Sequence, residues 1–249
     1  MSQWYTARKN KGLYDGSAKE PFKVSRSKIE FFLECPRCFY LDRKLGITRP
    51  PGFPFNLNIA VDALLKNEFD QYREKGEAHP LIKNYRVDAV PAKHEKIDEW
   101  RNTLQGIRFL HEPTNLLIYG AIDDLWQNSK GEYIVVDYKA TAKFSEITKL
   151  DKDWHDGYKR QMEIYQWLFK QNGFPTSDVG YFVYCNGKTN GKIFNAKLEF
   201  DVTLIPYTGK HDWIEKAVFD IHKCLNSDIT PESNPECEYC QYLAEMNRG

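Results

Sequence analysis

The pattern of apolar and polar residues changes between helical and strand-like periods along the chain. Apolar residues recur at helical spacing over residues 58–76, and Gly76 ends the run. The apolar face of this helix would consist of Ile59, Val61, Leu64, Leu65 and Phe69. The same period predicts helices over residues 25–46, interrupted at Pro36, and over 93–110, 155–172 and 210–225. Stretches rich in β-branched and aromatic residues predict strands over residues 81–90, 116–126, 132–139, 179–185 and 193–204.

The order of these elements predicts one α/β domain with a mixed sheet. Helices come first, followed by two strands joined by the turn-rich segment QNSKG, a helix, further strands and a last helix. The chain has 249 residues, of which 41% are hydrophobic, and it can therefore bury a sizeable core. No linker divides it into independent parts, so we expect a single domain over residues 1–249.

Charge and hydropathy narrow the function classes only slightly. The chain has 35 Lys and Arg against 35 Asp and Glu, so its net charge gives no indication of a nucleic-acid partner. There is no run of 18 apolar residues and no apolar leader, so we expect a cytoplasmic protein with no membrane partner. In that compartment the six cysteines are expected to be thiols or metal ligands rather than disulfides.

The segment GAIDDLWQNSKGEYIVVDYKAT, residues 120–141, places charges in two predicted strands. A hairpin centred near Lys130 would set Asp123 opposite Asp137, with their Cβ atoms roughly 4.5–5.5 Å apart. Lys139 would share the face of Asp137, while Tyr138 would point to the other face. Two converging carboxylates suit Mg²⁺, and such a site can drive phosphodiester hydrolysis. Spacing alone favours the alternative of a surface hairpin with ordinary ion pairs.

Two C-x-x-C pairs lie near opposite ends of the chain. Cys35 and Cys38 form CPRC, Cys237 and Cys240 form CEYC, and 198 residues lie between the pairs. Four such sulfurs can bind Zn²⁺ or a [4Fe–4S] cluster and would join the N- and C-terminal segments. The alternatives are four ordinary thiols or a redox-active pair.

Three motifs together resemble the RecB-type branch of the PD-(D/E)XK nuclease superfamily. They are GAID at residues 120–123, DYK at 137–139, and YKRQMEIY at 158–165, which follows a Y-x-x-Q-x-x-x-Y pattern. The split cysteine set is similar to that of iron–sulfur members, including CRISPR-associated nucleases, and this likeness implies a [4Fe–4S] cluster. Those members usually place one cysteine early and three late, so the two-plus-two arrangement here keeps Zn²⁺ as the alternative. The resemblance implies a restriction-endonuclease-like core over residues 58–204, with a central mixed sheet flanked by helices. Residues 25–46 and 226–249 would be the segments that carry the cysteine site.

The resemblance also implies a role for each matching residue. Asp123, Asp137 and the backbone carbonyl of Tyr138 would bind Mg²⁺ or Mn²⁺, and Lys139 would assist the attacking water. Gln161 would orient Lys139 or the phosphate, and Tyr165 would support the site. The family usually has a further ligand on an upstream helix, often a histidine. Here that helix offers Asp62, with Glu68 or Asp70 as substitutes.

Aromatic and basic residues beside these motifs are candidates for nucleic-acid contacts. Aromatic rings can stack on unpaired bases, while Arg and Lys bind phosphates. The predicted contacts are Phe39, Tyr40 and Arg43 beside the first cysteine pair, and Tyr158, Lys159 and Arg160 on the later helix. The alternative for Phe39 is packing beneath the cysteine site.

We therefore expect a metal-dependent deoxyribonuclease, acting as an exonuclease that prefers single-stranded ends. The expected partner is DNA, and the resemblance adds possible protein partners in DNA repair or CRISPR adaptation. The alternative is a non-catalytic nucleic-acid- or protein-binding module that keeps the nuclease fold and the Cys₄ site.

Overall fold

The computed structural model describes residues 12–52, 56–145, 147–191, 193 and 195–248. Contacts within the chain divide it into two compact units. The central unit comprises residues 54–107 and 120–211, and the terminal unit comprises residues 1–53, 108–119 and 212–249. A single nuclease domain over residues 1–249 stays a prediction.

The central unit is built on a five-stranded mixed sheet with the strand order β2-β5-β6-β7-β8. Its strands are β2 (Val90–Pro91), β5 (Asp124–Gln127), β6 (Tyr133–Thr141), β7 (Val179–Gly187) and β8 (Phe200–Thr208). The pair β6–β7 is parallel, and the other neighbouring pairs are antiparallel. Strand β6 is the middle strand, which agrees with its apolar residues on both faces.

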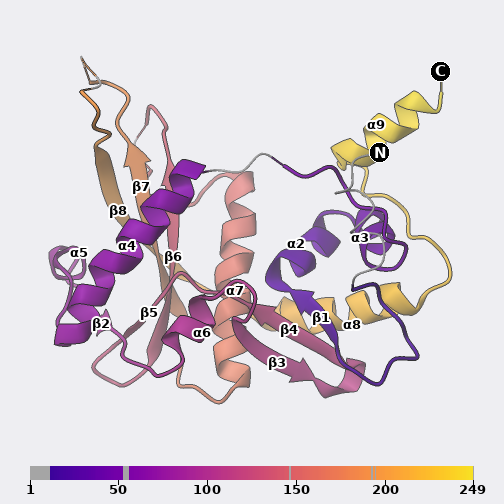
Figure 1. Ribbon diagram of the computed structural model, residues 1–249, viewed down its shortest axis with the longest axis horizontal. Coiled ribbons are helices and arrows are strands. Elements are labelled where there is room, and N and C mark those ends of the chain that lie inside the picture. The colour runs from indigo at the N-terminus through magenta and orange to yellow at the C-terminus, as the bar shows by residue number, and fades with distance from the viewer. Residues whose placement is uncertain (1–11, 53–55, 146, 192, 194, 249) are drawn as a thin grey trace. The chain divides into compact units, whose positions relative to one another are not determined.

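Helices α4 (Asn56–Lys75) and α7 (Asp156–Gln171) pack against β6 from either side (Figure 1). On the α4 side, Phe69 is fully buried and lies against the rings of Trp126 and Tyr138. On the α7 side, Met162 packs so closely over Gly180 of β7 that a Cβ there would lie 2.3 Å from the Met162 sulfur. The predicted mixed sheet flanked by helices is confirmed.

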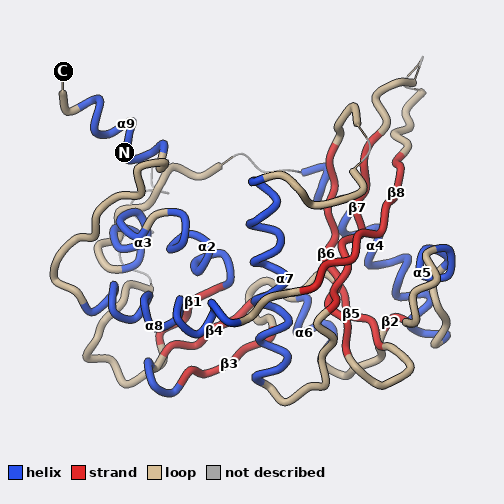
Figure 2. The backbone as a smooth tube through the Cα atoms, turned by 180° about the vertical axis from the view of Figure 1, so that it is seen from behind, coloured by secondary structure: helices blue, strands red, loops and turns tan. Residues whose placement is uncertain are grey.

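Within its described residues, the terminal unit contains a three-stranded sheet with the order β1-β4-β3 and four helices (Figure 2). The strands are β1 (Phe22–Ser25), β3 (Ile107–His111), whose first residue belongs to the central unit, and β4 (Leu116–Gly120). The helices are α2 (Arg26–Glu34), α3 (Pro36–Arg43), α8 (Asp212–Asn226) and α9 (Glu238–Met246), with a 3-10 turn η1 (Glu112–Thr114). Helices α2, α3 and α8 pack against one another, and Pro36 separates α2 from α3 as predicted.

Several predicted elements differ from the observed ones. The strand predicted over residues 81–90 is wrong, because Pro80 and the capping side chain of His79 start the short helix α5 (Pro80–Asn84). The helix predicted over residues 93–110 shortens to α6 (Ile97–Arg101). The chain then turns at Gly106, whose φ of 64° favours glycine. A Cβ at Gly106 would lie 2.4 Å from the carbonyl oxygen of Gly120.

Two further differences concern strand limits and helix faces. The strand predicted over residues 116–126 is two strands, β4 and β5, which belong to different sheets. The strand predicted over residues 193–204 begins only at Phe200. On α4, Phe69 is buried as predicted, whereas Ile59 and Leu64 are exposed.

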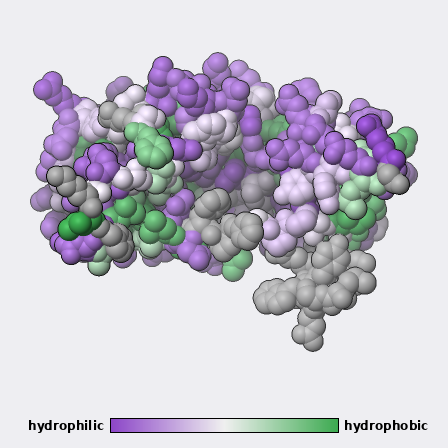
Figure 3. Space-filling model, turned by 90° about the horizontal axis from the view of Figure 1, so that it is seen from above, coloured by the Kyte–Doolittle hydropathy of each residue, from purple (hydrophilic) through white to green (hydrophobic). Residues whose placement is uncertain are grey.

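The visible surface is mainly hydrophilic, with separate hydrophobic patches (Figure 3), in keeping with a mean hydropathy of −0.63. Within the described residues, no helix combines the length and apolar character needed to cross a membrane.

Candidate active site and cysteine cluster

The β5–β6 hairpin brings the acidic motifs together in the predicted register. Asp124 pairs with Val136 and Leu125 with Val135, so Asp123, just before β5, lies opposite Asp137. The Asp123 carboxylate accepts a hydrogen bond of 2.8 Å from the backbone N–H of Tyr138. The turn and the strand alternation thus place both carboxylates on the face that also carries Lys139.

The Y-x-x-Q-x-x-x-Y face of α7 surrounds the Lys139 amine. This amine forms an ion pair with Asp137 and donates to Gln161 Oε1 at 3.4 Å. It also lies 4.6 Å from the centre of the Tyr158 ring. Gln161 Nε2 in turn donates to the Tyr165 hydroxyl at 3.3 Å. The helical spacing therefore brings the three motif residues of α7 to one cluster with Lys139.

Buried polar side chains attach α7 to the sheet beside it. Glu163 accepts hydrogen bonds from the Tyr207 hydroxyl and from the backbone N–H of Lys210. Gln166 donates to the carbonyl oxygens of Ser177 and Asp178, at 3.2 and 3.0 Å. These contacts hold the Gln161 face of the helix at a defined height over Lys139.

Burial and like charge shift the pKa values in this cluster. Burial raises the pKa of Asp123 to about 6, and the charge of Asp137 adds to the effect. Burial lowers the pKa of Lys139, but the carboxylates of Asp137 and Asp123 outweigh it and the net shift is upward. Lys139 is therefore a stable cation, whereas Asp123 lies in a site that disfavours its own negative charge.

On α4, Asp62 is the carboxylate that lies next to this cluster. It accepts a hydrogen bond of 2.8 Å from Lys66, whose amine is 4.0 Å from Asp123. Burial raises the pKa of Asp62, and the charge of Asp123 also contributes. Together with Tyr138 and Lys139, Asp62 lines a cavity of about 220 Å³.

The two alternatives considered for Asp62 are engaged elsewhere. Glu68 binds His79 at 2.8 Å, and Asp70 pairs with Arg73 and Arg101. Sequence reasoning missed Lys66, although its position four residues after Asp62 on a helix was a usable signal.

The acidic residues fit a hard divalent ion by their chemistry. Both carboxylate oxygens of Asp137 are buried, and one of them pairs with the Lys139 amine. Buried carboxylate oxygens are the kind of ligand that Mg²⁺ and Mn²⁺ take. The carboxylates of Asp62, Asp123 and Asp137 are not within 4.8 Å of one another, however. In the described part of the chain, only the cysteine cluster reaches that spacing.

Asp124, one residue after Asp123, lies in a different environment. It is fully buried and pairs with Arg73 and Arg101. It also accepts hydrogen bonds from the Tyr138 hydroxyl at 2.9 Å and the Trp126 indole N–H at 3.2 Å. Asp124 is therefore a structural residue, and the Tyr138 side chain is tied to it on the face opposite Lys139.

In the terminal unit, Cys35, Cys38, Cys237 and Cys240 form one compact cluster, as predicted. All four sulfurs lie within 4.8 Å of one another, with separations of 3.8, 3.7 and 3.5 Å for three of the pairs. The N-terminal ends of α3 and α9 carry them. Burial raises the pKa of Cys35, but hydrogen bonds from the backbone of Cys38 and Asn234 bring it down to about 7. That favours the thiolate at Cys35, whereas burial raises the pKa of Cys38 and of Cys240 in the metal-free cluster.

Arg49 supplies positive charge to this cluster. It donates to the Cys237 sulfur at 3.2 Å, and its guanidinium lies 4.5 Å from the ring centres of both Phe31 and Tyr239. A cation here offsets the charge of four thiolates. Sequence reasoning missed Arg49 because it stands in a proline-rich connector with no periodic signal.

Two of the predicted nucleic-acid contacts are buried, and the others are partly exposed. Phe39 and Tyr40 are buried at 0% and 3% exposure, and the Tyr40 hydroxyl donates to the Ser227 carbonyl. Burial removes these two rings from the predicted contacts, since neither face is open to a base. Arg43 lies 5.0 Å from the Phe22 ring centre. Lys159 pairs with Asp156 on the first turn of α7.

Comparison with known proteins identifies a family and finds similar solved structures. The family model of the PD-(D/E)XK nuclease superfamily matches residues 56–244. Among curated proteins, none matches the chain. The crystal structure of SSO0001 is similar at 17% identity and a TM-score of 0.40, covering 91% of this chain and 86% of that one.

Proposed function

Because this chain belongs to the PD-(D/E)XK nuclease superfamily, we propose that it is a RecB-type deoxyribonuclease that degrades single-stranded DNA from its ends. The observation that carries the proposal is the cluster at the carboxyl end of β6. There Asp123 and Asp137 oppose each other, and Lys139 contacts Gln161 of α7. The preference for single strands and ends rests on the likeness of the α7 motif to the RecB-type branch. Roles in repair or CRISPR adaptation stay predictions from the same likeness.

Members of this superfamily use divalent metals, and we assign the ligands here to Asp62, Asp123, Asp137 and the Tyr138 carbonyl. A bound divalent ion would polarise the scissile phosphate and make water a better nucleophile at neutral pH. Asp123, whose pKa is about 6, and Asp137, which is fully buried, would both be stabilised by a divalent cation at this position. Lys66 would then leave its place between Asp62 and Asp123.

Lys139 would orient the attacking water and stabilise the charge that develops on the phosphate. Without a metal, the carboxylates of Asp137 and Asp123 raise its pKa and keep it a cation; a divalent ion bound by these carboxylates would weaken that shift, so we propose only an electrostatic and orienting role for the amine. Gln161 holds the amine in place through its carbonyl oxygen, and Tyr165 holds the Gln161 amide. These two are positioning residues in the proposed reaction.

The test is cleavage of end-labelled single-stranded DNA in Mg²⁺ or Mn²⁺. Asp137→Ala should reduce cleavage to background, and Lys139→Ala should slow it by about 10²–10⁴-fold, the usual range for one acid–base group. Asp201→Ala is the matched control, because Asp201 is an exposed carboxylate paired with Lys188 on the surface. A closed circular single strand should resist the wild type. If wild type and Asp137→Ala leave linear DNA equally intact, the nuclease proposal fails and the binding-module alternative takes its place.

For the cysteine cluster we propose a single Zn²⁺ ion. Four sulfurs at about 2.3 Å from one tetrahedral ion lie about 3.8 Å from one another. The separations of 3.5–3.8 Å support that geometry. A [4Fe–4S] cluster, the alternative, attaches each cysteine to a different iron and needs its sulfurs farther apart.

A further inference from the structure

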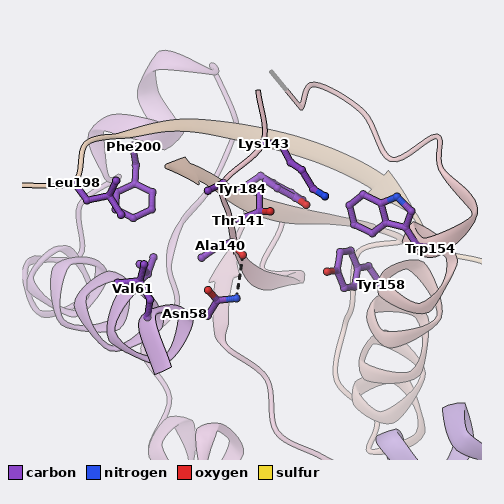
Figure 4. A pocket seen from close by; sticks show the side chains of 12 residues that line it. Asn58, Val61, Ala140, Thr141, Lys143, Trp154, Tyr158, Tyr184, Leu198 and Phe200 are labelled. Carbon is purple, nitrogen blue, oxygen red and sulfur yellow. Dashed lines mark hydrogen bonds between the residues drawn. The ribbon is translucent and has the colours of Figure 1, made fainter. Parts of the chain in front are cut away.

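A larger cavity of about 580 Å³ opens beside the proposed active site, within the central unit (Figure 4). Its volume lies within the roughly 300–1,000 Å³ typical of clefts that take small organic groups. It forms at the carboxyl end of β6, where Ala140 and Thr141 are the last two residues of the strand. Val61, Leu198 and Phe200 lie on one side of it, and Lys143, Trp154 and Tyr158 on the other (Figure 4).

The two cavities are lined by shared residues. Asn58, Val61, Ala140 and Tyr158 line both the 580 Å³ cavity and the smaller one that holds Asp62 and Lys139. The Tyr158 ring lies over the Lys139 amine. A nucleotide whose phosphate met Lys139 would therefore have its neighbour at the mouth of the larger cavity.

Trp154 is an exposed aromatic surface held in a fixed place. The residue is 49% exposed, and its ring centre lies 3.8 Å from that of the buried His155. The Tyr158 ring stands edge-on to it, 5.8 Å away at 88°. A half-exposed aromatic ring that packs on neighbouring side chains can serve as a stacking platform for a nucleobase.

Lys143 adds a cation beside this platform. Its amine lies 5.8 Å from the Trp154 ring centre. Its backbone is held on both sides by Asn186, which accepts from the Lys143 N–H at 2.7 Å and donates to its carbonyl at 3.1 Å. An aromatic ring with an adjacent cation suits a base and the phosphate next to it.

We propose that this cavity binds one unpaired nucleobase next to the scissile phosphate, with Trp154 as the stacking platform and Lys143 on the neighbouring phosphate. The inference rests on the proposed nuclease function and deepens it, because it supplies a physical origin for a single-strand preference. A base in a duplex is already stacked and paired, and it would have to be extruded at a cost before it could enter.

The test is the affinity for a single-stranded oligodeoxynucleotide, measured by fluorescence anisotropy with no divalent metal added. Trp154→Ala should weaken binding by about 5- to 150-fold, the effect of losing one base–aromatic stack. Trp154→Phe should recover most of this loss. Tyr85→Ala is the matched control, because Tyr85 is 45% exposed and does not line the cavity. An oligomer of abasic residues should bind wild type and Trp154→Ala alike, since it has no base to stack.

The outcomes separate this inference from the nuclease proposal. The base site is refuted if Trp154→Ala binds the single strand within twofold of wild type. It is also refuted if the substitution weakens binding of the abasic strand as much as binding of the normal strand. Both outcomes hold whether or not DNA is cleaved. If binding depends on Trp154 but no strand is cut in Mg²⁺ or Mn²⁺, the base site stands and the nuclease proposal fails. A 2-aminopurine base placed at successive positions should be quenched most at one position in wild type and at none in Trp154→Ala.

Discussion

Replacing Asp124 with alanine should destabilise the protein strongly, whereas the same change at the adjacent Asp123 should not. Asp124 is fully buried, and the side chains of its partners Arg73 and Arg101 are only 8% and 9% exposed. Removing one partner of a buried ion pair costs about 3–5 kcal/mol, because the remaining charge stays buried without compensation. The Tyr138 hydroxyl and the Trp126 indole N–H would lose their acceptor as well.

Asp123 lies in the opposite electrostatic situation. Its pKa of about 6, against an ordinary 3.8, means that its ionised form is disfavoured at neutral pH by on the order of 1–3 kcal/mol. It accepts one hydrogen bond from the Tyr138 backbone, so part of the gain from removing the charge is lost again. Asp123→Ala should therefore be as stable as wild type, or more stable, when no divalent metal is bound.

The assay is urea or thermal unfolding of wild type, Asp124→Ala, Asp124→Asn and Asp123→Ala at pH 7 in metal-free buffer. For a chain of this length, 3–5 kcal/mol corresponds to a fall in Tm of roughly 6–20 °C. Asp124→Asn keeps the shape and removes the charge, so it isolates the ion pair from the cavity. The reasoning is refuted if Asp124→Ala unfolds within 1 kcal/mol of wild type, or if Asp123→Ala loses as much stability as Asp124→Ala.

Two further predictions concern the cysteine cluster and a buried histidine. Purified protein should contain one equivalent of zinc, and Cys38→Ser should lose both the zinc and part of the thermal stability. Cys224→Ser, which changes a buried cysteine outside the cluster, should keep the zinc. A brown protein that contains iron and sulfide would contradict the zinc assignment. Burial lowers the pKa of His155, so the unfolded chain binds a proton at this histidine more tightly than the folded chain does. The stability contributed by the neutral ring is therefore lost as the pH falls below about 6.5. Wild type should lose more stability than His155→Asn between pH 7 and pH 5, and equal losses would count against the burial argument.

The hairpin could be predicted from sequence because its determinants are local. Strand alternation and a short turn fix which residues oppose each other, so the pairing of Asp123 with Asp137 and the shared face of Lys139 follow from the segment itself. Helical spacing likewise places Gln161 and Tyr165 on one face of α7. The compact Cys₄ cluster was predictable for a different reason, since two C-x-x-C pairs have few other uses in one chain.

Long-range packing decided the rest. Residues 116–126 read as one strand, but β4 and β5 lie in different sheets because their partners, β1 and β6, are distant in sequence. Phe39 and Tyr40 look like exposed aromatics beside a basic run, yet both are buried, and no local pattern distinguishes the two cases.

By itself, the sequence determined the local chemistry of this protein: two opposed carboxylates, a lysine on their face and four cysteines in two C-x-x-C pairs. Only the tertiary structure decided that Lys66 lies between Asp62 and Asp123, that Arg49 donates to a cysteine sulfur of the cluster and that Trp154 lines a cavity. The physical reason is that periodicity records each segment's own conformation. Which side chains meet across segments depends on packing that no single segment encodes.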